Sequence, residues 1–251
     1  MNIDITEKVI VVTGAARGIG HTLALGLAAE GALTAVLTRH LPQAQAVAAE
    51  IEQKYGPGRA LALAADITDE EAVITALTHV DQSWGRVDAL VNNAAWMPPP
   101  RPILDNTIDD LRRVLDTNVV GSFLTTKHAA PIMIREGGGR IIYITSMSGV
   151  QAGPGMAAYG ASKAGVNILN NVVHRELANK GIRTAALAPG LTDTPGLHAS
   201  FSDDYISRGA AAMPAGRIGQ PEDVLPLVAF LCSDAAQHIS GTLLPVRPAA
   251  A

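Results

Sequence analysis

The chain has 251 residues, of which 48% are hydrophobic and 17% charged, so it can bury a large core and does not have the composition of a disordered protein. Its formal net charge of -4 and its scattered basic residues argue against nucleic acid as a partner. One cysteine excludes an internal disulfide, and we expect a cytoplasmic protein with no signal peptide and no membrane contact, because no apolar run approaches the roughly 20 residues that span a bilayer.

Short apolar runs alternate with longer amphipathic stretches in the first part of the chain. Gly31 is expected to end one helix, and Pro42 to open the next. Thr68 or Asp69 is expected to cap a third helix. The expected strands span residues 8–13, 33–38, 59–64 and 87–91, and the expected helices span residues 19–30, 42–55 and 69–84.

The alternation continues to the end of the chain. A long helical segment over residues 108–135 is expected to break near Thr117. The later helices are expected over residues 156–179 and 221–231, and the later strands over residues 140–145, 182–187 and 242–246. Continuous apolar strands separated by helices indicate a parallel sheet covered on both faces. We therefore predict one α/β domain over residues 1–251, with a doubly wound sheet of the Rossmann type.

The first strand leads into a glycine-rich loop that begins at Thr13 and reads T-G-A-A-R-G-I-G. Its three glycines allow a tight turn and a close approach to a ligand. The helix that follows offers unpaired N–H groups and a partial positive charge. The loop therefore predicts a site for the pyrophosphate of a dinucleotide, although its spacing differs from the common G-x-G-x-x-G fingerprint.

No carboxylate follows the second strand, where an acidic residue would bond the 2′-hydroxyl of NAD. The chain has Thr38-Arg39-His40 at this point. Arg39, and Arg17 in the glycine loop, are suited to pair with a 2′-phosphate through charge-assisted hydrogen bonds. We therefore expect NADP(H) as the cofactor, with NAD(H) as the alternative.

Tyr159 and Lys163 are four residues apart in the segment Y-G-A-S-K and lie on one face of a predicted helix. A phenol with a pKa of about 10 is a poor base at neutral pH, and a nearby ammonium lowers that pKa. Ser146 follows a predicted strand, so its hydroxyl is expected at the edge of the sheet where substrates bind. The three side chains predict an acid/base centre.

Further motifs occur in a fixed order. The segment N-N-A-A begins at Asn92, Asn118 interrupts a helix, and P-G begins at Pro189. Together with the glycine loop, Ser146 and the Y-x-x-x-K spacing, this combination resembles the short-chain dehydrogenase/reductase family over nearly the whole chain. The resemblance implies a single Rossmann-type domain with a seven-stranded parallel sheet flanked by helices.

The resemblance also implies a catalytic tetrad of Asn118, Ser146, Tyr159 and Lys163. Tyr159 would give a proton to the carbonyl during reduction, and Ser146 would orient and polarise that carbonyl. Lys163 would bond the nicotinamide ribose, and Asn118 would hold a water in a proton relay. The implied reaction is hydride transfer between NADP(H) and a ketone or aldehyde and its alcohol, with no metal.

The remaining expected site residues are cofactor and substrate contacts. The expected cofactor contacts are Gly14, Arg17, Gly18, Ile19, Arg39, Asp66, Ile67, Asn92, Ala94, Tyr159, Lys163, Pro189, Gly190, Thr192 and Thr194. The expected substrate contacts are Trp96, Ser148, Pro154, Leu197 and Tyr205. Residues 191–214 are expected to form a lid with an apolar inner face, which favours a mainly apolar or mixed carbonyl or alcohol. Arg101, His198 and Arg208 are expected to be solvated loop charges, with binding of an anionic substrate group as the alternative.

Two features depart from the family pattern or add to it. Members of the family commonly end the last strand with D-G-G, whereas Val246 is followed here by R-P-A. In the family this end often helps to build a tetramer interface, so the resemblance does not predict that contact for this chain. Residues 96–102 form a stiff, proline-rich loop, which either walls the substrate pocket or is a plain surface connection. Small residues on the helix over residues 156–179 and the habit of the family predict a homodimer or homotetramer.

Two other functions fit parts of the pattern. A dinucleotide-binding sensor without turnover would share the fold, but it would not need an intact Tyr159–Lys163 pair with Ser146. An enoyl reductase of related type would use a longer Tyr–Lys spacing than the one found here.

Overall fold

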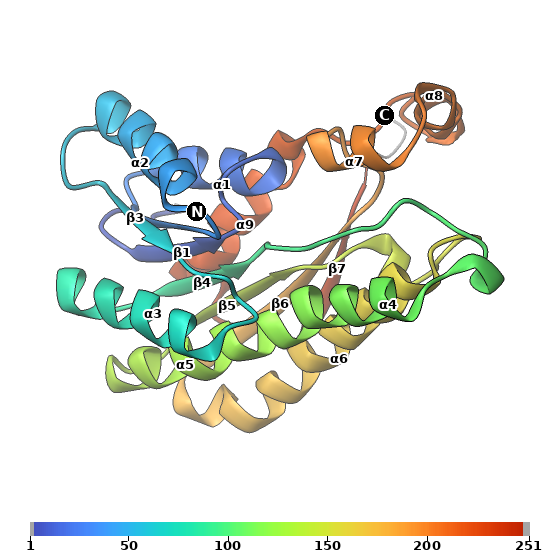
Figure 1. The fold of residues 1–251 in the computed structure, drawn as a ribbon. Coiled ribbons are helices and arrows are strands. Elements are labelled where there is room, and N and C mark those ends of the chain that lie inside the picture. Colours follow the sequence, from blue (N-terminus) through green and yellow to red (C-terminus); the bar gives the residue numbers. More distant parts are fainter. Residues whose placement is uncertain (1–2, 248–251) are drawn as a thin grey trace.

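The computed structural model describes residues 3–247, and a seven-stranded parallel sheet forms its centre (Figure 1). The strands are β1 (Val9–Thr13), β2 (Leu33–Thr38), β3 (Ala60–Ala64), β4 (Ala89–Asn92), β5 (Gly139–Ile144), β6 (Ile182–Pro189) and β7 (Thr242–Val246). Their order across the sheet is β3-β2-β1-β4-β5-β6-β7, and every neighbouring pair is parallel. This arrangement confirms the predicted Rossmann-type, doubly wound fold.

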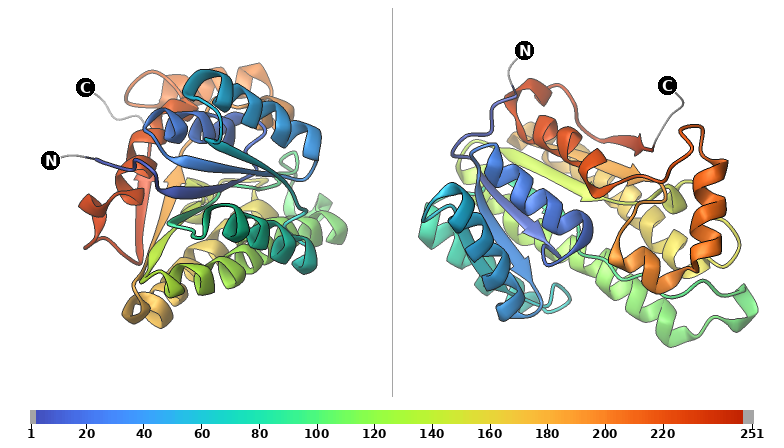
Figure 2. Two further views of the ribbon diagram at one scale, coloured as in Figure 1. Left: turned by 90° about the vertical axis from the view of Figure 1, so that its left-hand side faces the viewer. Right: turned by 90° about the horizontal axis from the view of Figure 1, so that it is seen from above.

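Successive residues of β1 belong to two different cores, one on each face of the sheet. Ile10 and Val12 pack with α1 (Gly18–Ala29), α2 (Leu41–Tyr55) and α9 (Leu225–Cys232). Val9 and Val11 pack with α3 (Glu70–Trp84), α5 (Gly121–Arg135) and α6 (Ala157–Leu177). Because strand side chains alternate between faces, a strand buried on both sides must be apolar throughout. Figures 1 and 2 show the two helical layers.

The long helical segment after β4 breaks near Thr117, as predicted. The helix α4 (Ile108–Leu115) passes through a π-helical turn, Asp116–Val120, into α5. Asn118 lies within this wider turn and is fully buried. Such turns occur mostly as single insertions in α-helices and are frequent at functional sites.

Beyond β6 the chain leaves the sheet and forms two short helices, α7 (Pro195–Ser200) and α8 (Asp203–Ala212), before it returns to α9 (Figure 2). Thr194 caps α7 by accepting a hydrogen bond from the Leu197 amide at 3.2 Å. Ser202 caps α8 in the same way, with the Tyr205 amide at 3.3 Å. No residue of α8 is buried, so this segment is held by its caps and by few core contacts.

Neither a membrane-spanning helix nor a cluster of metal ligands is found in the part of the chain that the structure describes. No helix there is both long enough and apolar enough to cross a bilayer. No group of three or more His, Cys, Asp or Glu side chains within residues 3–247 is placed to hold a metal ion. Cys232 is buried, and burial raises the pKa of its thiol to about 12, so it is not placed to act as a nucleophile.

Candidate active site

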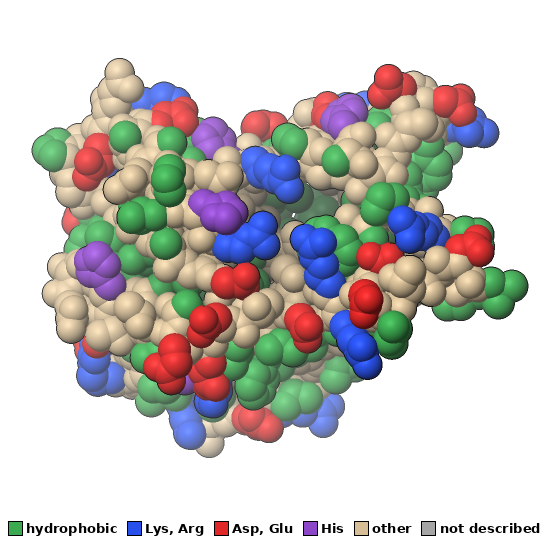
Figure 3. All heavy atoms as spheres, in the orientation of Figure 1, with side chains coloured by type: hydrophobic (Ala, Val, Ile, Leu, Met, Phe, Trp, Pro, Cys, Tyr) green, Lys and Arg blue, Asp and Glu red, His purple; other side chains and the backbone are tan. Residues whose placement is uncertain are grey.

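A cleft with a volume of about 1930 Å3 opens at the carboxyl ends of the strands (Figure 3). Its walls come from the loops after β1 to β6 and from parts of α1, α2, α4, α6, α7 and α8. The strand order reverses between β1 and β4, so the chain crosses to opposite faces of the sheet on either side of this point. Open α/β sheets bind ligands in the crevice that this reversal creates.

The glycine loop after β1 is in backbone contact with the loop after β4. Gly14 has a φ of 65°, and a Cβ atom built on it would lie 2.7 Å from the Cα of Ala94. A Cβ atom on Gly20 would lie 2.3 Å from the carbonyl oxygen of Gly14. The Asn93 side-chain amide donates to the carbonyl of Thr13 at 2.9 Å and to that of Gly14 at 3.2 Å. The two loops therefore hold each other, and only glycine fits at these positions.

The first turn of α1 faces the cleft with its backbone N–H groups free of side-chain caps. Its N-cap residue, Arg17, makes no side-chain capping bond, and no acidic residue lies in the first turn. The first turn of α3 differs, because Asp69 accepts from the Ala72 amide and two glutamates follow it. An uncapped, positively polarised helix start beside close-packed glycines fits the pyrophosphate of a dinucleotide.

Most of the expected cofactor contacts line this one cleft. They are Gly14, Arg17, Gly18, Ile19, Arg39, Asp66, Ile67, Ala94, Tyr159, Lys163, Pro189, Gly190, Thr192 and Thr194. Among residues 3–247, neither Arg17 nor Arg39 has a carboxylate within ion-pair distance, so both guanidinium groups are available to an anionic ligand.

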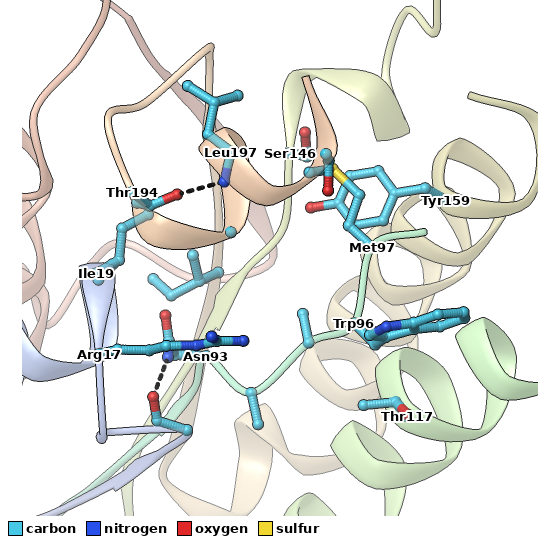
Figure 4. Close-up of a pocket in the computed structure, with 18 of the residues that line it drawn as sticks. Arg17, Ile19, Asn93, Trp96, Met97, Thr117, Ser146, Tyr159, Thr194 and Leu197 are labelled. Atoms are coloured by element: carbon cyan, nitrogen blue, oxygen red, sulfur yellow. Dashed lines mark hydrogen bonds between the residues drawn. The ribbon is translucent and has the colours of Figure 1, made fainter. Parts of the chain in front are cut away.

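Tyr159 and Ser146 lie across the pocket from Arg17 (Figure 4), and Lys163 lines the same cleft. The Tyr159 hydroxyl points into the pocket beside Ser146. The Lys163 ammonium lies 5.7 Å from the centre of the Tyr159 ring and donates to the carbonyl of Ile144 at 2.8 Å. Because Tyr159 and Lys163 are one helical turn apart on α6, the helix fixes their relative position.

The pKa values of these groups correct one expectation. Burial raises the pKa of Tyr159 to about 12, and a hydrogen bond with Ser146 offsets part of that rise. Burial also lowers the pKa of Lys163 to about 8. The expected lowering of the Tyr159 pKa by Lys163 is therefore wrong for this structure, because desolvation of the phenolate is the larger effect.

Asn118 links the helical break to the loop after β4. Its amide oxygen accepts from the Trp96 backbone N–H at 2.8 Å, and its amide nitrogen donates to the Trp96 carbonyl at 3.0 Å. The same nitrogen donates to the Ser162 hydroxyl at 2.9 Å, and that hydroxyl donates to the carbonyl of Tyr159 at 2.7 Å. Asn118 thus positions both the loop and the start of α6 within the site.

Comparison with known proteins identifies the family. The family model described as short chain dehydrogenase matches residues 8–204. The chain belongs to the short-chain dehydrogenase family. It is 38% identical to a 3-oxoacyl-[acyl-carrier-protein] reductase of Synechocystis sp. over 94% of both chains. It is 34% identical to a chloroplastic NADPH-dependent aldehyde reductase-like protein of Arabidopsis thaliana, over 96% of this chain and 93% of the relative.

Solved structures agree with this membership. A 7α-hydroxysteroid dehydrogenase complexed with NADH and 7-oxo glycochenodeoxycholic acid superimposes with a TM-score of 0.91 and 34% identity, over 98% of this chain and 94% of that one. A 3-ketoacyl-(acyl-carrier-protein) reductase from Brucella melitensis complexed with NADH gives a TM-score of 0.90 and 32% identity, over 97% and 98%. The fold and the order of site-forming loops are therefore those of this oxidoreductase family.

One expected cofactor contact of this short-chain dehydrogenase is placed elsewhere. The Asn92 side chain is buried below the cleft, where it accepts from the Thr125 hydroxyl at 2.6 Å and donates to the Thr126 hydroxyl at 3.2 Å. The neighbouring Asn93 lines the cleft instead. The cause is the alternation of side chains along β4, which directs Val91 toward α1 and Asn92 toward α5.

The expected substrate residues all belong to the wall of the cleft. Trp96, Ser148, Pro154, Leu197 and Tyr205 all line it. The Tyr205 ring stacks on that of Phe201 with centroids 4.5 Å apart, so the lid presents an aromatic surface to the cleft. The proline-rich loop contributes Trp96, Met97 and Pro99 to the wall, and Figure 4 shows Met97 directed toward Tyr159.

The three expected solvated charges all have partners. They pair as Arg101 with Asp110, His198 with Asp193, and Arg208 with Asp204. Arg247, in the place of the family's D-G-G end, lines the cleft, whereas Pro248 and Ala249 lie outside the described residues.

Arg113 is a cleft residue that the sequence reasoning missed. Its guanidinium carbon lies 4.1 Å from the centre of the Trp96 ring, and both residues line the cleft. Arg113 precedes Thr117, another lining residue, by four positions, and this spacing is the signal that was available. The contact with Trp96 depends on the path of the loop after β4, which the local sequence does not determine.

Proposed function

We propose that this short-chain dehydrogenase transfers a hydride between NADP(H) and a ketone or aldehyde and its alcohol, with Tyr159 as the general acid and base. The observation that carries the proposal is that Tyr159, Ser146 and Lys163 lie in the same cleft as the glycine loop and the uncapped start of α1. Arg17 and Arg39 support the choice of NADP(H).

Each residue of the proposed active site has a separate role in the reaction. Tyr159 donates a proton to the carbonyl oxygen in reduction and accepts it back in oxidation. Ser146 orients that oxygen, Asn118 holds the surrounding backbone, and Lys163 binds the ribose next to the nicotinamide. The bound nicotinamide supplies the hydride and, in its oxidised form, a positive charge that favours the phenolate. Residues 191–214 act as the lid that separates the substrate from water.

The alternatives are NAD(H) as the cofactor and a sensor without turnover. NAD(H) is an alternative cofactor because two of the similar solved structures, of other proteins, are complexed with NADH. A sensor without turnover needs only the phosphate wall of the cleft. The names of the relatives cover acyl, aldehyde and steroid substrates, so the proposed substrate is the carbonyl–alcohol pair that these reactions share.

The variant Tyr159→Phe tests the assigned role. It keeps the ring and removes the proton, so we expect kcat to fall by about 100-fold to 10,000-fold while the Kd of NADPH stays within about twofold. The assay is a carbonyl panel followed by oxidation of NADPH and, separately, of NADH. Tyr143→Phe is the matched control, because it removes a buried phenolic hydroxyl that bonds only Thr126, outside the cleft. Unaltered turnover in Tyr159→Phe would refute the role.

We also propose a homo-oligomer and keep a cytoplasmic location as a prediction. The helices α5 and α6 cover the same face of the sheet. Large apolar side chains remain exposed on α6 and on α5 with the π-helical turn before it, namely Val120, Phe123, Ile168 and Val172. Such side chains gain free energy when a second copy covers them. Gel filtration should give a dimer or tetramer, and elution near 26.0 kDa would contradict this.

A further inference from the structure

The loop of residues 146–149, which we call the serine loop, lies directly on α6. A Cβ atom built on Gly149 would lie 2.7 Å from the carbonyl carbon of Lys163. A Cβ atom built on Gly160 would lie 2.9 Å from the carbonyl oxygen of Ser148. The backbones of the loop and the helix therefore touch at two points where only glycine fits. The position of the serine hydroxyl in the cleft depends on how this loop is held on α6.

Hydrogen bonds within the serine loop connect Gly149 to Ser146. The Ser146 hydroxyl oxygen accepts from the Ser148 backbone N–H at 3.1 Å, and the Gly149 N–H donates to the Ser146 carbonyl at 2.9 Å. A shift of Gly149 therefore displaces Ser146 as well. Tyr159 is sensitive to this position, because burial raises its pKa and a hydrogen bond with Ser146 offsets part of that rise.

The side chain of Asn167 binds the serine loop from α6. Its amide nitrogen donates to the carbonyl of Gly149 at 3.1 Å. Its amide oxygen is buried and has no hydrogen-bond partner within residues 3–247. The opposite orientation of the amide would set this oxygen against the Gly149 carbonyl oxygen, and neither of these atoms can donate a proton. The bond to Gly149 therefore fixes the orientation of the Asn167 amide.

Asn167 extends the line of residues on α6 that we assign to catalysis. Tyr159, Lys163 and Asn167 are spaced by four residues, so they follow one face of the helix over two turns. Lys163 donates to the carbonyl of Ile144, before Ser146, and Asn167 donates to the carbonyl of Gly149, after it. This face of α6 therefore binds the chain on both sides of the serine.

We propose that Asn167 is a positioning residue for Ser146: it holds the serine loop on α6 through the Gly149 carbonyl and so keeps the serine hydroxyl beside that of Tyr159. The proposal rests on the proposed function, because it needs Ser146 to orient the carbonyl oxygen of the substrate. Asn167 itself is not among the described residues that line the cleft. Its loss should therefore lower turnover and leave the binding of the dinucleotide nearly unchanged.

Asn170 provides a matched control three residues further along α6. Its amide nitrogen also donates to a backbone carbonyl, that of Thr242, at 3.1 Å. Its amide oxygen is likewise buried without a partner in the described range. Thr242 is the first residue of β7 and lies at the end of that strand away from the cleft. Asn170→Leu therefore removes the same kind of hydrogen bond as Asn167→Leu, away from the serine loop.

The test compares Asn167→Leu with Asn170→Leu, and it uses the carbonyl compound of the panel that the wild type reduces fastest. Asn167→Leu should lower kcat about tenfold, because the carbonyl oxygen is less well oriented, with the KM and the Kd of NADPH within about threefold of the wild type. The pH at which kcat for the reverse oxidation reaches half its maximum should rise, because the bond from Ser146 that lowers the Tyr159 pKa is weakened. Asn170→Leu should leave kcat within about twofold and this pH unchanged.

The variant Ser146→Ala separates positioning from a general loss of structure. In that background Asn167→Leu should lower kcat by no more than about a further twofold, because the hydroxyl that Asn167 positions is gone. Asn167→Asp keeps the size of the side chain and removes the donor, so it takes the same tests, against Asn170→Asp, if Asn167→Leu does not fold.

Two results would overturn the role of Asn167 and leave the proposed function intact. One is an equal loss of kcat in the Asn167 and Asn170 variants with no shift in the pH profile. The other is a full further loss of kcat when Asn167→Leu is added to Ser146→Ala. Full turnover by Ser146→Ala alone would instead refute the proposed function at Ser146, and the role of Asn167 with it.

Discussion

The two ends of the cleft are built in different ways. At the phosphate end, the loops after β1 and β4 touch through their backbones, and a Cβ atom on Gly14 or Gly20 would overlap a neighbour. At the lid end, α8 has no buried residue, and a Cβ atom on Gly196 would meet its nearest atom only at 3.9 Å. Gly14 and Gly20 at the phosphate end therefore have no space for a side chain, whereas Gly196 in the lid segment does.

The largest expected effect comes from adding one methyl group to the phosphate end. Gly20→Ala would place a Cβ atom 2.3 Å from the Gly14 carbonyl oxygen and 2.4 Å from the Asn93 side-chain nitrogen, so the glycine loop must move. We expect the free energy of unfolding to fall by about 1–3 kcal/mol and the Kd of the dinucleotide to rise about tenfold or more. Urea denaturation and fluorescence titration measure the two effects.

Gly196→Ala in α7 is the matched control for that variant. The new methyl group has space there, and alanine favours a helix, so stability should change by no more than about 1 kcal/mol in either direction and the Kd of the dinucleotide should stay unchanged. Equal losses of cofactor binding in both variants would remove the contrast between the two ends of the cleft.

A smaller effect is expected from the buried ammonium at the reaction end. Burial lowers the pKa of Lys163 to about 8, from 10.5 for an ordinary lysine. Below pH 8 the native and unfolded states both hold this proton. Above pH 8 the native state releases it first, so Lys163 makes stability rise with pH until the unfolded state also loses the proton near pH 10.5.

The variant Lys163→Met lacks this titration. The wild type should therefore gain stability relative to Lys163→Met between pH 8 and pH 10, by at most about 1.4 kcal/mol per pH unit. Urea denaturation of both proteins across this range measures the difference. Parallel stability curves would mean that Lys163 is not held in the dry environment that the structure shows.

The sequence predicted the sheet because its strands are apolar on both faces, and it predicted the helical break because Asn118 is a poor residue for a helix interior. It predicted that Tyr159 and Lys163 lie together because they are four residues apart on one helix. It predicted that Ser146 lies near them because Ser146 follows the end of a strand. The burial of Asn92 against α5 could also have been predicted from the sequence, because side chains alternate between the two faces of the sheet along β4.

Other features of the site depend on contacts between distant segments. The high pKa of Tyr159 comes from burial by several loops, and the helix that carries Tyr159 does not show how dry its surroundings are. The stack of Arg113 on Trp96 joins α4 to a loop whose path is fixed by Asn118. Such properties appear only once the chain is folded.

The proposed catalysis depends most on the orientation of the Tyr159 hydroxyl. A crystal structure of the protein with NADP+ tests it directly. We predict that the Tyr159 hydroxyl faces the reactive carbon of the nicotinamide, with Ser146 beside it and space for a carbonyl group between them. A hydroxyl that points away from that carbon, or a nicotinamide ring that leaves no space for a substrate, would contradict the role of Tyr159 as the acid and base.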